Sequence, residues 1–246
     1  MNKLIKEIFS KQKVIDKNGK EYPLVGNIDL NEGQYLYNLI KKNADITQTL
    51  EIGCAYGVAS LFICSALENR KNKKHIIIDP FQDTDYNGIG LFNLDRSGIN
   101  FYKYFNKKSE FILPELAVSH PNSFDLIFID GWHTFDHTMI DLFYANKLIK
   151  KNGYIVIDDC RYHSVSKAVS YFSSYPSYSI ISEVSTKKLS YKAKLTKTIS
   201  YLIPKFLWMI LPKFIYDILS RVQYSSMVTL KKIDDDHRDW KWFKNF

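Results

Sequence analysis

Two apolar runs that each end in acidic residues constrain this chain of 246 residues more than any other feature. The first is Leu126-Ile-Phe-Ile-Asp130, and the second is Tyr154-Ile-Val-Ile-Asp158-Asp159. Runs of Ile, Val, Leu and Phe without polar alternation are typical of strands buried on both faces, as in a parallel sheet covered by helices. Ligands of such sheets bind outside the carboxyl ends of the strands. The sequence therefore predicts that these three carboxylates lie at one crevice.

From Thr49 onward, strand-like and helix-like segments alternate along the chain. Strands are expected near 48–52, 75–79, 101–105, 125–130, 153–158, 178–184 and 225–232. Helices are expected near 57–67, 88–98, 109–118, 136–150 and 164–174. This alternation predicts an α/β fold with a Rossmann-like, doubly wound sheet and helices on both faces. No clean helix separates the last two strands, so the sheet is expected to be mostly parallel with an antiparallel last strand.

Three regions are expected. Residues 1–46 read as an N-terminal helical cap, with an amphipathic first helix and a second helix capped by Asp29 or Asn31. Residues 47–186 and 223–246 form the main domain, and residues 187–222 form a basic, aromatic insert. The N-terminus lacks the pattern of a secretory signal, and the three cysteines are too few for a disulfide framework. A reduced cytoplasmic location is therefore expected.

The net charge of +8 is concentrated in the insert, which carries +7 between Lys187 and Val222. Because the rest of the chain is nearly neutral, a general nucleic-acid-binding surface is disfavoured. Basic residues beside Phe, Trp and Tyr are typical of a segment lying on an anionic membrane surface, peripheral to the inner face of the membrane. A lid over the crevice and a dimerisation element, giving a homo-oligomer, are the alternatives. Pro204 and Pro212 and the interspersed charges argue against a membrane-spanning helix.

The first strand of the main domain runs into a turn with two glycines, Gly53 and Gly57. Glycine lets the chain turn sharply and lets a ligand lie against bare backbone. The spacing differs from the GxGxxG of dinucleotide folds and suits a bulkier, less anionic ligand. Asp79 ends the next strand, where acids of nucleotide-binding folds accept ribose hydroxyls. The alternative is a tight turn between strand and helix, with Asp79 capping a loop.

These motifs resemble those of class I S-adenosylmethionine-dependent methyltransferases. Leu50-Glu-Ile-Gly-Cys-Ala-Tyr-Gly is similar to their first motif, and Ile78-Asp-Pro-Phe to their second acidic motif. Phe128-Ile-Asp-Gly-Trp-His, followed by Gly153-Tyr-Ile-Val-Ile-Asp-Asp, resembles the branch with macrocin-type sugar O-methyltransferases and, more distantly, catechol O-methyltransferase. The resemblance covers roughly residues 25–185. It implies that S-adenosyl-L-methionine is bound by Glu51, Gly53, Tyr56 and Gly57 at the methionine end, Asp79 at the ribose, and Phe81 and Ser109 at the adenine.

The chemistry of the crevice suits methyl transfer to a hydroxyl. A divalent cation lowers the pKa of a coordinated hydroxyl, and Mg²⁺ prefers carboxylate and water oxygens. The resemblance implies that Asp130, Asp158 and Asp159 hold the metal and that His133 is the general base, a role suited to imidazole. The alternatives are that the acid pair caps a helix and that Asp130 starts a turn. His137 and His163 are expected to be surface or capping residues.

The sequence therefore predicts a metal-assisted O-methyltransferase that acts on a hydroxyl of a sugar or glycan, which would be lipid-linked if the insert contacts a membrane. A metal-independent methyltransferase acting on a small molecule through His133 alone is the second interpretation. A methyltransferase-like fold that serves as a binding or scaffold module is the third. The intact glycine turn and the four polar residues at the crevice argue against the third interpretation.

Overall fold

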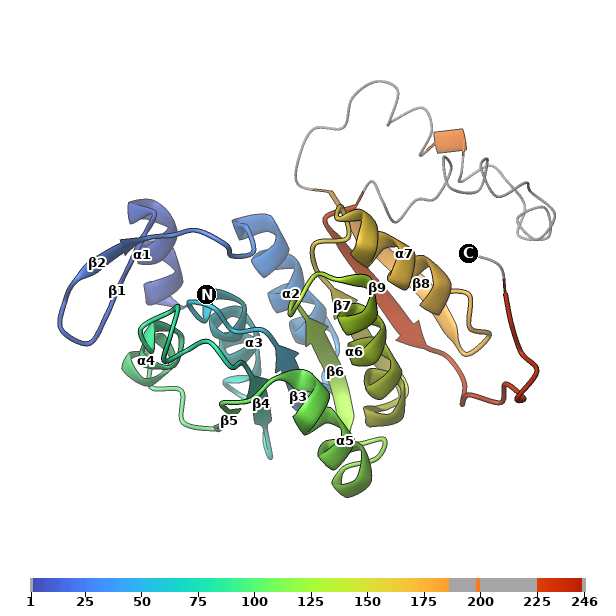
Figure 1. Ribbon diagram of the computed structural model, residues 1–246. Coiled ribbons are helices and arrows are strands. Elements are labelled where there is room, and N and C mark those ends of the chain that lie inside the picture. Colours follow the sequence, from blue (N-terminus) through green and yellow to red (C-terminus); the bar gives the residue numbers. More distant parts are fainter. Residues whose placement is uncertain (1, 186–197, 200–224, 245–246) are drawn as a thin grey trace.

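A computed structural model of the protein describes residues 2–185, 198–199 and 225–244 (Figure 1). Apart from 198–199, the basic insert predicted at 187–222 lies outside the described residues. Its interpretations as a lid, a dimer element or a membrane-surface segment therefore stay predictions. Within the described ranges, no helix has the length and apolar character needed to cross a membrane.

The main sheet has seven strands in the order β5-β4-β3-β6-β7-β9-β8. The strands are β3 Gln48–Ile52, β4 Lys74–Ile78, β5 Tyr102–Phe105, β6 Phe124–Ile129, β7 Ile149–Ile157, β8 Tyr178–Val184 and β9 Met227–Lys232. All neighbouring pairs are parallel except those of β9, which runs antiparallel to both β7 and β8. This arrangement confirms the predicted doubly wound sheet with an antiparallel last strand.

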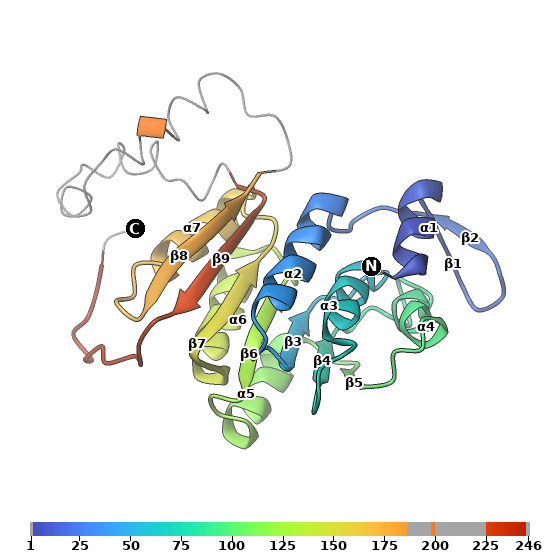
Figure 2. The same cartoon turned by 180° about the vertical axis from the view of Figure 1, so that it is seen from behind.

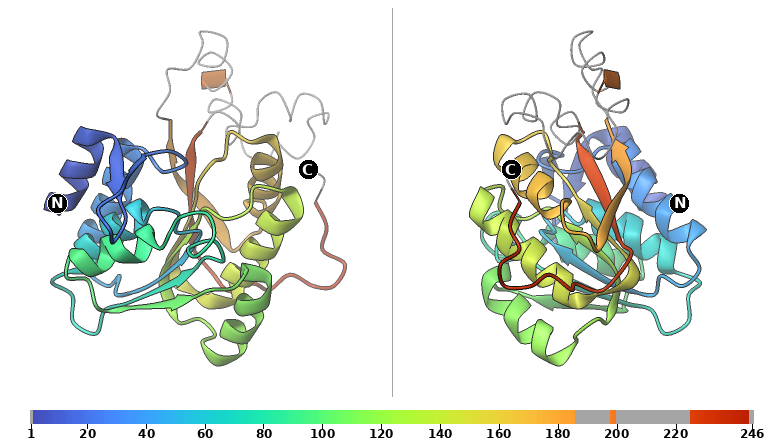
Figure 3. Two further views of the ribbon diagram at one scale, coloured as in Figure 1. Left: turned by 60° about the vertical axis from the view of Figure 1, so that its left-hand side comes forward. Right: turned by 90° about the vertical axis from the view of Figure 1, so that its right-hand side faces the viewer.

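Helices cover both faces of the sheet, as Figures 1 and 2 show from opposite sides. The helices are α1 Lys3–Lys11, α2 Leu30–Lys42, α3 Val58–Leu67, α4 Ile89–Arg96, α5 Ser109–Ser119, α6 Phe135–Leu148 and α7 His163–Phe172. On one side of the sheet, α3 contacts α1, α2 and α4, and on the other side α6 contacts α5 and α7. The sheet therefore lies between two helical layers (Figure 3). Each layer encloses its own apolar core. The central strands are therefore buried on both faces, which explains their uninterrupted apolar sequences.

The N-terminal segment departs from its prediction in one respect. Residues between the two helices, where no strand was expected, form a small antiparallel hairpin, β1 Lys13–Ile15 with β2 Glu21–Pro23. Its turn is held by the Asp16 carboxylate, which accepts hydrogen bonds from the backbone N–H groups of Asn18 and Lys20. Strands of three residues carry too little alternation to be recognised from sequence. Asp29 and Asn31 were both predicted as possible caps of α2. The structure shows that Asp29 caps the helix, in a capping box with Glu32.

The helices α2 and α3 approach each other closely at a glycine. A Cβ atom added to Gly33 would lie 2.1 Å from the Phe62 ring, which is fully buried. Glycine lowers helix stability by about 1 kcal/mol relative to alanine, so its presence inside α2 reflects this contact rather than helix propensity. The contact fixes the N-terminal segment against the layer that covers the first strand of the main domain.

We predict that Gly33→Ala destabilises the protein by about 1–3 kcal/mol, because overpacking outweighs the gain in helix propensity. Chemical denaturation monitored by circular dichroism measures the change. Adding Phe62→Leu should recover part of the loss in the double variant. A Gly33→Ala protein as stable as the parent, or more stable, would contradict the packing described for α2 and α3.

The carboxyl ends of the four central strands form one continuous row. Beyond the last strand residues, the backbone N–H groups of Gly53, Asp79, Asp130 and Asp158 each donate to a carbonyl of the neighbouring strand. The strands β6 and β7 are neighbours, as expected from the spacing of their acids. The β3 strand lies between β4 and β6, where the chain switches direction across the sheet. This switch point is where open α/β sheets bind ligands.

Candidate active site

Two glycines shape the turn between β3 and α3. Gly53 has φ 87°, and a Cβ atom there would lie 1.9 Å from the carbonyl oxygen of Asp130. Gly57 has φ 75°, and its Cβ atom would lie 2.6 Å from the carbonyl oxygen of Gly90. Side chains are excluded from both positions by backbone conformation and by space. The turn is therefore packed directly against the end of β6 and the start of α4.

Asp79 fastens this turn. Its Oδ2 accepts hydrogen bonds from the N–H groups of Cys54 at 2.7 Å and Ala55 at 3.0 Å, and its Oδ1 accepts one from Phe81 N–H at 2.7 Å. A carboxylate offers about four acceptor positions, so about one stays available on Oδ1. The Asp79 carboxylate therefore already stabilises the turn. Its binding of the ribose stays a prediction.

Two amide side chains complete the support of the turn. Gln82 Nε2 donates to the Ala55 carbonyl at 2.7 Å, and Asn93 Nδ2 donates to the Tyr56 carbonyl at 2.8 Å. The Tyr56 side chain is buried, and its ring meets the edge of Tyr86 with centroids 5.1 Å apart. Neither amide was singled out from the sequence, where Gln82 precedes the helix expected near 88–98 and Asn93 lies within it.

Glu51 lies behind the turn and is fully buried. Its Oε2 accepts a hydrogen bond from Ser60 Oγ and lies 2.8 Å from His75 Nε2. Its Oε1 is buried and lacks a hydrogen-bond partner among the described residues. Sequence reasoning selected Glu51 but missed Ser60 and His75. His75 could have been found from the pairing of the first two strands of the main domain, which places it beside Thr49 and close to Glu51.

The two residues predicted for the adenine side, Phe81 and Ser109, have different partners. Phe81 packs against Trp132, with ring centroids 5.8 Å apart and planes at 31°. Ser109 is the first residue of α5, and its hydroxyl forms a hydrogen bond with the Asp141 carboxylate. Asp141 is buried, and its Oδ1 has no hydrogen-bond partner in the described part of the chain. Burial raises the pKa of Asp141 to about 7.

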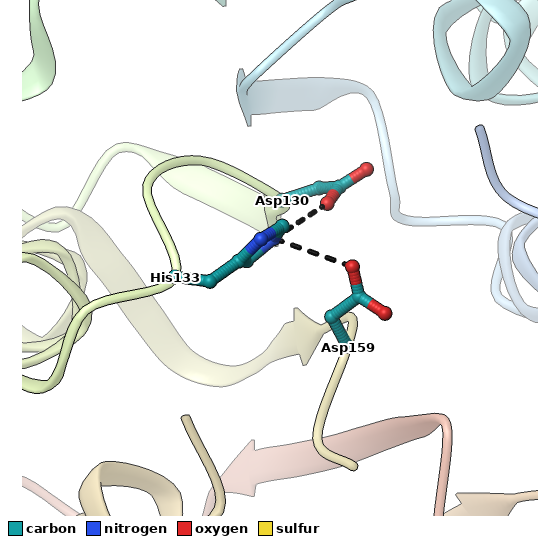
Figure 4. Close-up of side chains that lie close together, drawn as sticks. All are labelled: Asp130, His133 and Asp159. Atoms are coloured by element: carbon teal, nitrogen blue, oxygen red, sulfur yellow. Dashed lines mark hydrogen bonds and ion pairs between the residues drawn. The ribbon is translucent and has the colours of Figure 1, made fainter. Parts of the chain in front are cut away.

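Asp130, His133 and Asp159 converge at the carboxyl edge of the sheet (Figure 4). His133 Nε2 lies 3.3 Å from Asp130 Oδ1 and 3.4 Å from Asp159 Oδ2. One potential ligand atom from each residue lies within 4.8 Å of the other two. The side chains stay 22%, 37% and 45% exposed, in chain order, so solvent and small ligands reach them. The structure thus brings together three of the four residues predicted for the metal and the base.

Asp158 is not part of this convergence. Its carboxyl is buried, and burial followed by the charges of Asp130 and Glu32 raises its pKa well above the usual range. Glu32 comes from α2, is itself buried, and has a pKa raised by burial. Glu32 was not selected from the sequence. The Asp158 carboxylate is thus outside the group of converging ligand atoms, although the charge of Asp130 acts on it, and its role at the metal stays a prediction.

The electrostatics of the cluster favour a cation. Burial raises the pKa of Asp130 to about 6, although the hydrogen bond and charge of His133 act in the opposite direction. The hydrogen bond with Asp130 raises the pKa of His133 in turn. A positive charge placed among these carboxylates would offset their mutual repulsion. The two carboxylates supply the hard oxygen ligands that Mg²⁺ and Mn²⁺ prefer.

Tyr162 is an exposed aromatic residue that the sequence analysis did not select. Its ring lies nearly parallel to the His133 ring, with planes at 19° and centroids 5.2 Å apart, and the residue is 54% exposed. Trp132, at 56%, is similarly exposed. The Tyr162 ring thus presents an exposed surface beside His133, and the Trp132 ring presents another on the residue that precedes it. The other histidines of this edge match their expected roles, since His137 bonds to Thr134 Oγ1 and His163 is exposed at the start of α7.

A cavity of about 290 Å³ opens at the opposite edge of the sheet, before β8 and after β9. Its lining includes Ser177, Asp235 and Trp242. The acids of this cavity do not form a group of metal-ligand atoms within the described ranges, unlike Asp130, His133 and Asp159. We therefore place the candidate active site at the carboxyl edge rather than at this cavity.

Comparisons with known proteins bear on the family and the fold of this chain. Residues 50–160 match a family model described as a methyltransferase domain. An uncharacterised protein of Acanthamoeba polyphaga mimivirus is 32% identical over 158 residues, which cover 61% of this chain and 66% of that protein, just under two thirds of its length.

Solved methyltransferase structures share the fold at low sequence identity. An O-methyltransferase from Bacillus cereus, in complex with SAH, aligns with a TM-score of 0.60 at 12% identity, over 85% of this chain and 83% of that chain. An SAH-bound methyltransferase from Podospora anserina aligns with a TM-score of 0.61 at 13% identity, over 96% and 89%. An O-methyltransferase from Streptomyces achromogenes, in complex with SAM, aligns with a TM-score of 0.58 at 15% identity, over 84% and 81%. The chain thus has the fold of class I S-adenosylmethionine-dependent methyltransferases.

The buried carboxyl of Asp141 provides a test by pH. Burial raises the pKa of Asp141 from 3.8 to about 7. Between about pH 4 and about pH 7 the Asp141 carboxyl is therefore protonated in the folded protein and ionised in the unfolded chain. The contribution of Asp141 to stability therefore falls as pH rises from about 4 to about 7 and stays low above that range. Asp141→Asn keeps an oxygen for Ser109 and removes the titration. We predict that the variant gains about 2–4 kcal/mol relative to the parent between pH 4 and pH 8.

Urea denaturation of both proteins at the two pH values measures this difference. The other buried carboxyls titrate in both proteins, so their contributions cancel in the comparison. A stability difference between Asp141→Asn and the parent that does not change with pH would contradict the burial described for this carboxyl.

Proposed function

We propose that the protein is an S-adenosyl-L-methionine-dependent O-methyltransferase, assisted by a divalent cation, that methylates a hydroxyl of a sugar or glycan. The observation that carries the proposal is the convergence of Asp130, His133 and Asp159 directly beside the Gly53 turn. The matched methyltransferase domain and the O-methyltransferases of the same fold, two of them bound to SAM or SAH, support it.

The cofactor, when bound, supplies a methyl group activated on a sulfonium. Its site would be formed by Glu51, Gly53, Tyr56, Gly57 and Asp79 around the turn, with Phe81 and Ser109 toward the adenine. Two observations fit such a ligand: the bare backbone at Gly53, and the buried Oε1 of Glu51, which has no partner within the described residues. An ammonium group satisfies a carboxylate oxygen of this kind, and a methionine moiety carries one.

The cation would be held by Asp130 and Asp159, and Asp158 remains the predicted third ligand. The contribution of the cation would be to lower the pKa of the acceptor hydroxyl and to fix its orientation. His133 would accept the hydroxyl proton on its imidazole ring. The resulting imidazolium would be stabilised by Asp130 and Asp159, whose oxygens lie 3.3 and 3.4 Å from Nε2. The partly exposed position of His133 leaves it accessible to an acceptor entering from solvent.

The exposed rings of Trp132 and Tyr162 support a ring-shaped acceptor. The apolar face of a sugar ring packs on aromatic surfaces. The Tyr162 ring stands beside His133, and the exposed Trp132 ring packs against Phe81. Residues 187–222 combine basic and aromatic side chains, which supports contact with an anionic membrane surface. We therefore propose that the acceptor is a lipid-linked glycan held near such a membrane. Loss of flotation with anionic liposomes when the basic residues of 187–222 are neutralised would support that part of the proposal. Absence of flotation by the parent protein would refute it.

A metal-independent methyltransferase is the second candidate. The observation in its favour is that His133 already pairs with two carboxylates, an arrangement that can stabilise an imidazolium without a cation. The two candidates differ in their response to a chelator. A non-catalytic binding module is the third candidate, and an S-adenosylmethionine-binding protein that transfers no methyl group to any glycan or phenol would favour it.

We predict that EDTA abolishes methyl transfer and that Mg²⁺ or Mn²⁺ restores it. Asp159→Ala and His133→Ala should each lower kcat by about 100-fold or more, the range of a lost general base or metal ligand. Both variants should still bind S-adenosylhomocysteine, because neither residue lies in the turn. Transfer of a labelled methyl group from S-adenosylmethionine to a panel of glycans measures activity, and calorimetry measures binding.

Asp235→Ala provides the matched control, because this exposed aspartate lies in an acidic run at the opposite edge of the sheet. It should leave both activity and metal dependence unchanged. Full activity in EDTA would contradict the role of the cation, while full activity of both site variants would contradict the site itself.

We further predict that Tyr162→Ala raises the KM for the acceptor by about 3- to 10-fold, because an aromatic contact worth about 0.5–1.5 kcal/mol is lost. The KM for S-adenosylmethionine should not change. Tyr162→Phe should behave like the parent, and Phe143→Ala removes an exposed ring of α6 as a control. An unchanged acceptor KM in Tyr162→Ala would show that this ring does not contact the acceptor.

A further inference from the structure

Three polar side chains lie fully buried beneath the glycine turn. Thr49 and Glu51 occupy the same face of β3, and His75 stands beside Thr49 on the neighbouring strand β4. The layer around them, between the sheet and α3, is apolar core. Buried polar groups in such surroundings need hydrogen-bond partners to offset the loss of water. The arrangement of these partners is therefore informative.

Among the described residues, both polar partners of the Glu51 carboxylate contact the same oxygen, Oε2. Oε2 accepts a hydrogen bond from Ser60 Oγ and lies 2.8 Å from His75 Nε2. A carboxylate only accepts, so the imidazole donates through Nε2. His75 is fixed at its other nitrogen, where Nδ1 lies 2.9 Å from Thr49 Oγ1. The second oxygen, Oε1, is buried and has no hydrogen-bond partner in the part of the chain that the structure describes.

The negative charge of Glu51 acts on that of Asp130. The two residues lie on neighbouring strands on either side of Gly53, and the charge of Glu51 contributes to the raised pKa of Asp130. A cation at Oε1 would satisfy this oxygen and offset the repulsion. S-adenosylmethionine carries an α-ammonium group on its amino-acid part, so it supplies a cation with three donors.

We propose that His75 and Ser60 are positioning residues for the cofactor: by holding Oε2 of Glu51, they leave Oε1 to accept a hydrogen bond from the α-ammonium of S-adenosylmethionine. The inference rests on the proposed function. His75 and Ser60 act through Glu51 and do not touch the reacting atoms. Because Glu51 would contact only the ammonium, His75 and Ser60 favour ligands that carry the amino-acid part of the cofactor.

Two ligands separate this role from a structural one. S-adenosylhomocysteine keeps the α-ammonium, whereas 5′-methylthioadenosine has the same nucleoside and thioether sulfur without the amino-acid part. Calorimetry on the full chain measures both affinities for the parent, His75→Leu, Ser60→Ala and His75→Gln. The glutamine amide can donate to Oε2 from nearly the same place as Nε2 of the imidazole. His120→Leu removes a histidine at the end of α5 as a control.

We expect His75→Leu and Ser60→Ala to weaken S-adenosylhomocysteine binding by about 10-fold or more, the effect of a misplaced hydrogen bond to a charged group. Binding of 5′-methylthioadenosine should change by less than about 2-fold, since that ligand carries no ammonium for Glu51 to bind. His75→Gln should restore most of the difference, and His120→Leu should match the parent. Thermal melting establishes which variants are folded, and Ser60→Ala decides the result if His75→Leu does not fold.

Equal weakening of both ligands, or no weakening of either, would overturn the positioning role while leaving the cofactor assignment intact. A parent protein that binds neither ligand would instead refute the proposed function on which this inference rests.

Discussion

The close contact between Gly53 and the Asp130 carbonyl is the constraint on which the rest of the site depends. It joins the turn after β3 to the end of β6, with no space for a Cβ atom between them. The turn is the part of the molecule suited to a nucleoside cofactor, and Asp130 belongs to the cluster suited to a cation. Because the two are packed backbone against backbone, a methyl donor in the turn and a hydroxyl at the cluster would meet at a fixed separation. Orientation of this kind is a large part of catalysis in group transfer.

Carboxylates gathered with little positive charge near them form the second theme of the structure. Glu32, Asp130 and Asp158 all have raised pKa values, because burial disfavours their charged forms and their charges repel one another. Such an arrangement costs folding stability unless a ligand compensates it. The proposed divalent cation and the ammonium of the cofactor would supply compensation at two neighbouring points. The cost in the free protein would then be recovered when the ligands bind.

The sequence predicted the sheet well because its central strands are buried on both faces and so lack polar interruptions. The acids were placed at one edge by the same reasoning, since the ends of parallel strands share an edge. The hairpin of β1 and β2 was missed, because three-residue strands leave no period. Side-chain partners were also beyond reach: Tyr162 beside His133 and Ser60 beside Glu51 depend on the register of packed elements. The role of Asp158 at the metal, which the resemblance implies, stays a prediction, because its buried carboxyl is not among the converging ligand atoms of Asp130, His133 and Asp159.

The most direct test of the account is a crystal of the protein with S-adenosylhomocysteine and Mn²⁺, measured for anomalous scattering. The account predicts one manganese peak between Asp130 and Asp159, at roughly 2.0–2.3 Å from their oxygens, the range for hard divalent cations. It also predicts the sulfur of the bound ligand beside the Gly53 turn and facing the metal. A ligand in the turn with no peak at these aspartates would contradict the metal-assisted mechanism. A ligand bound away from the turn would contradict the account as a whole.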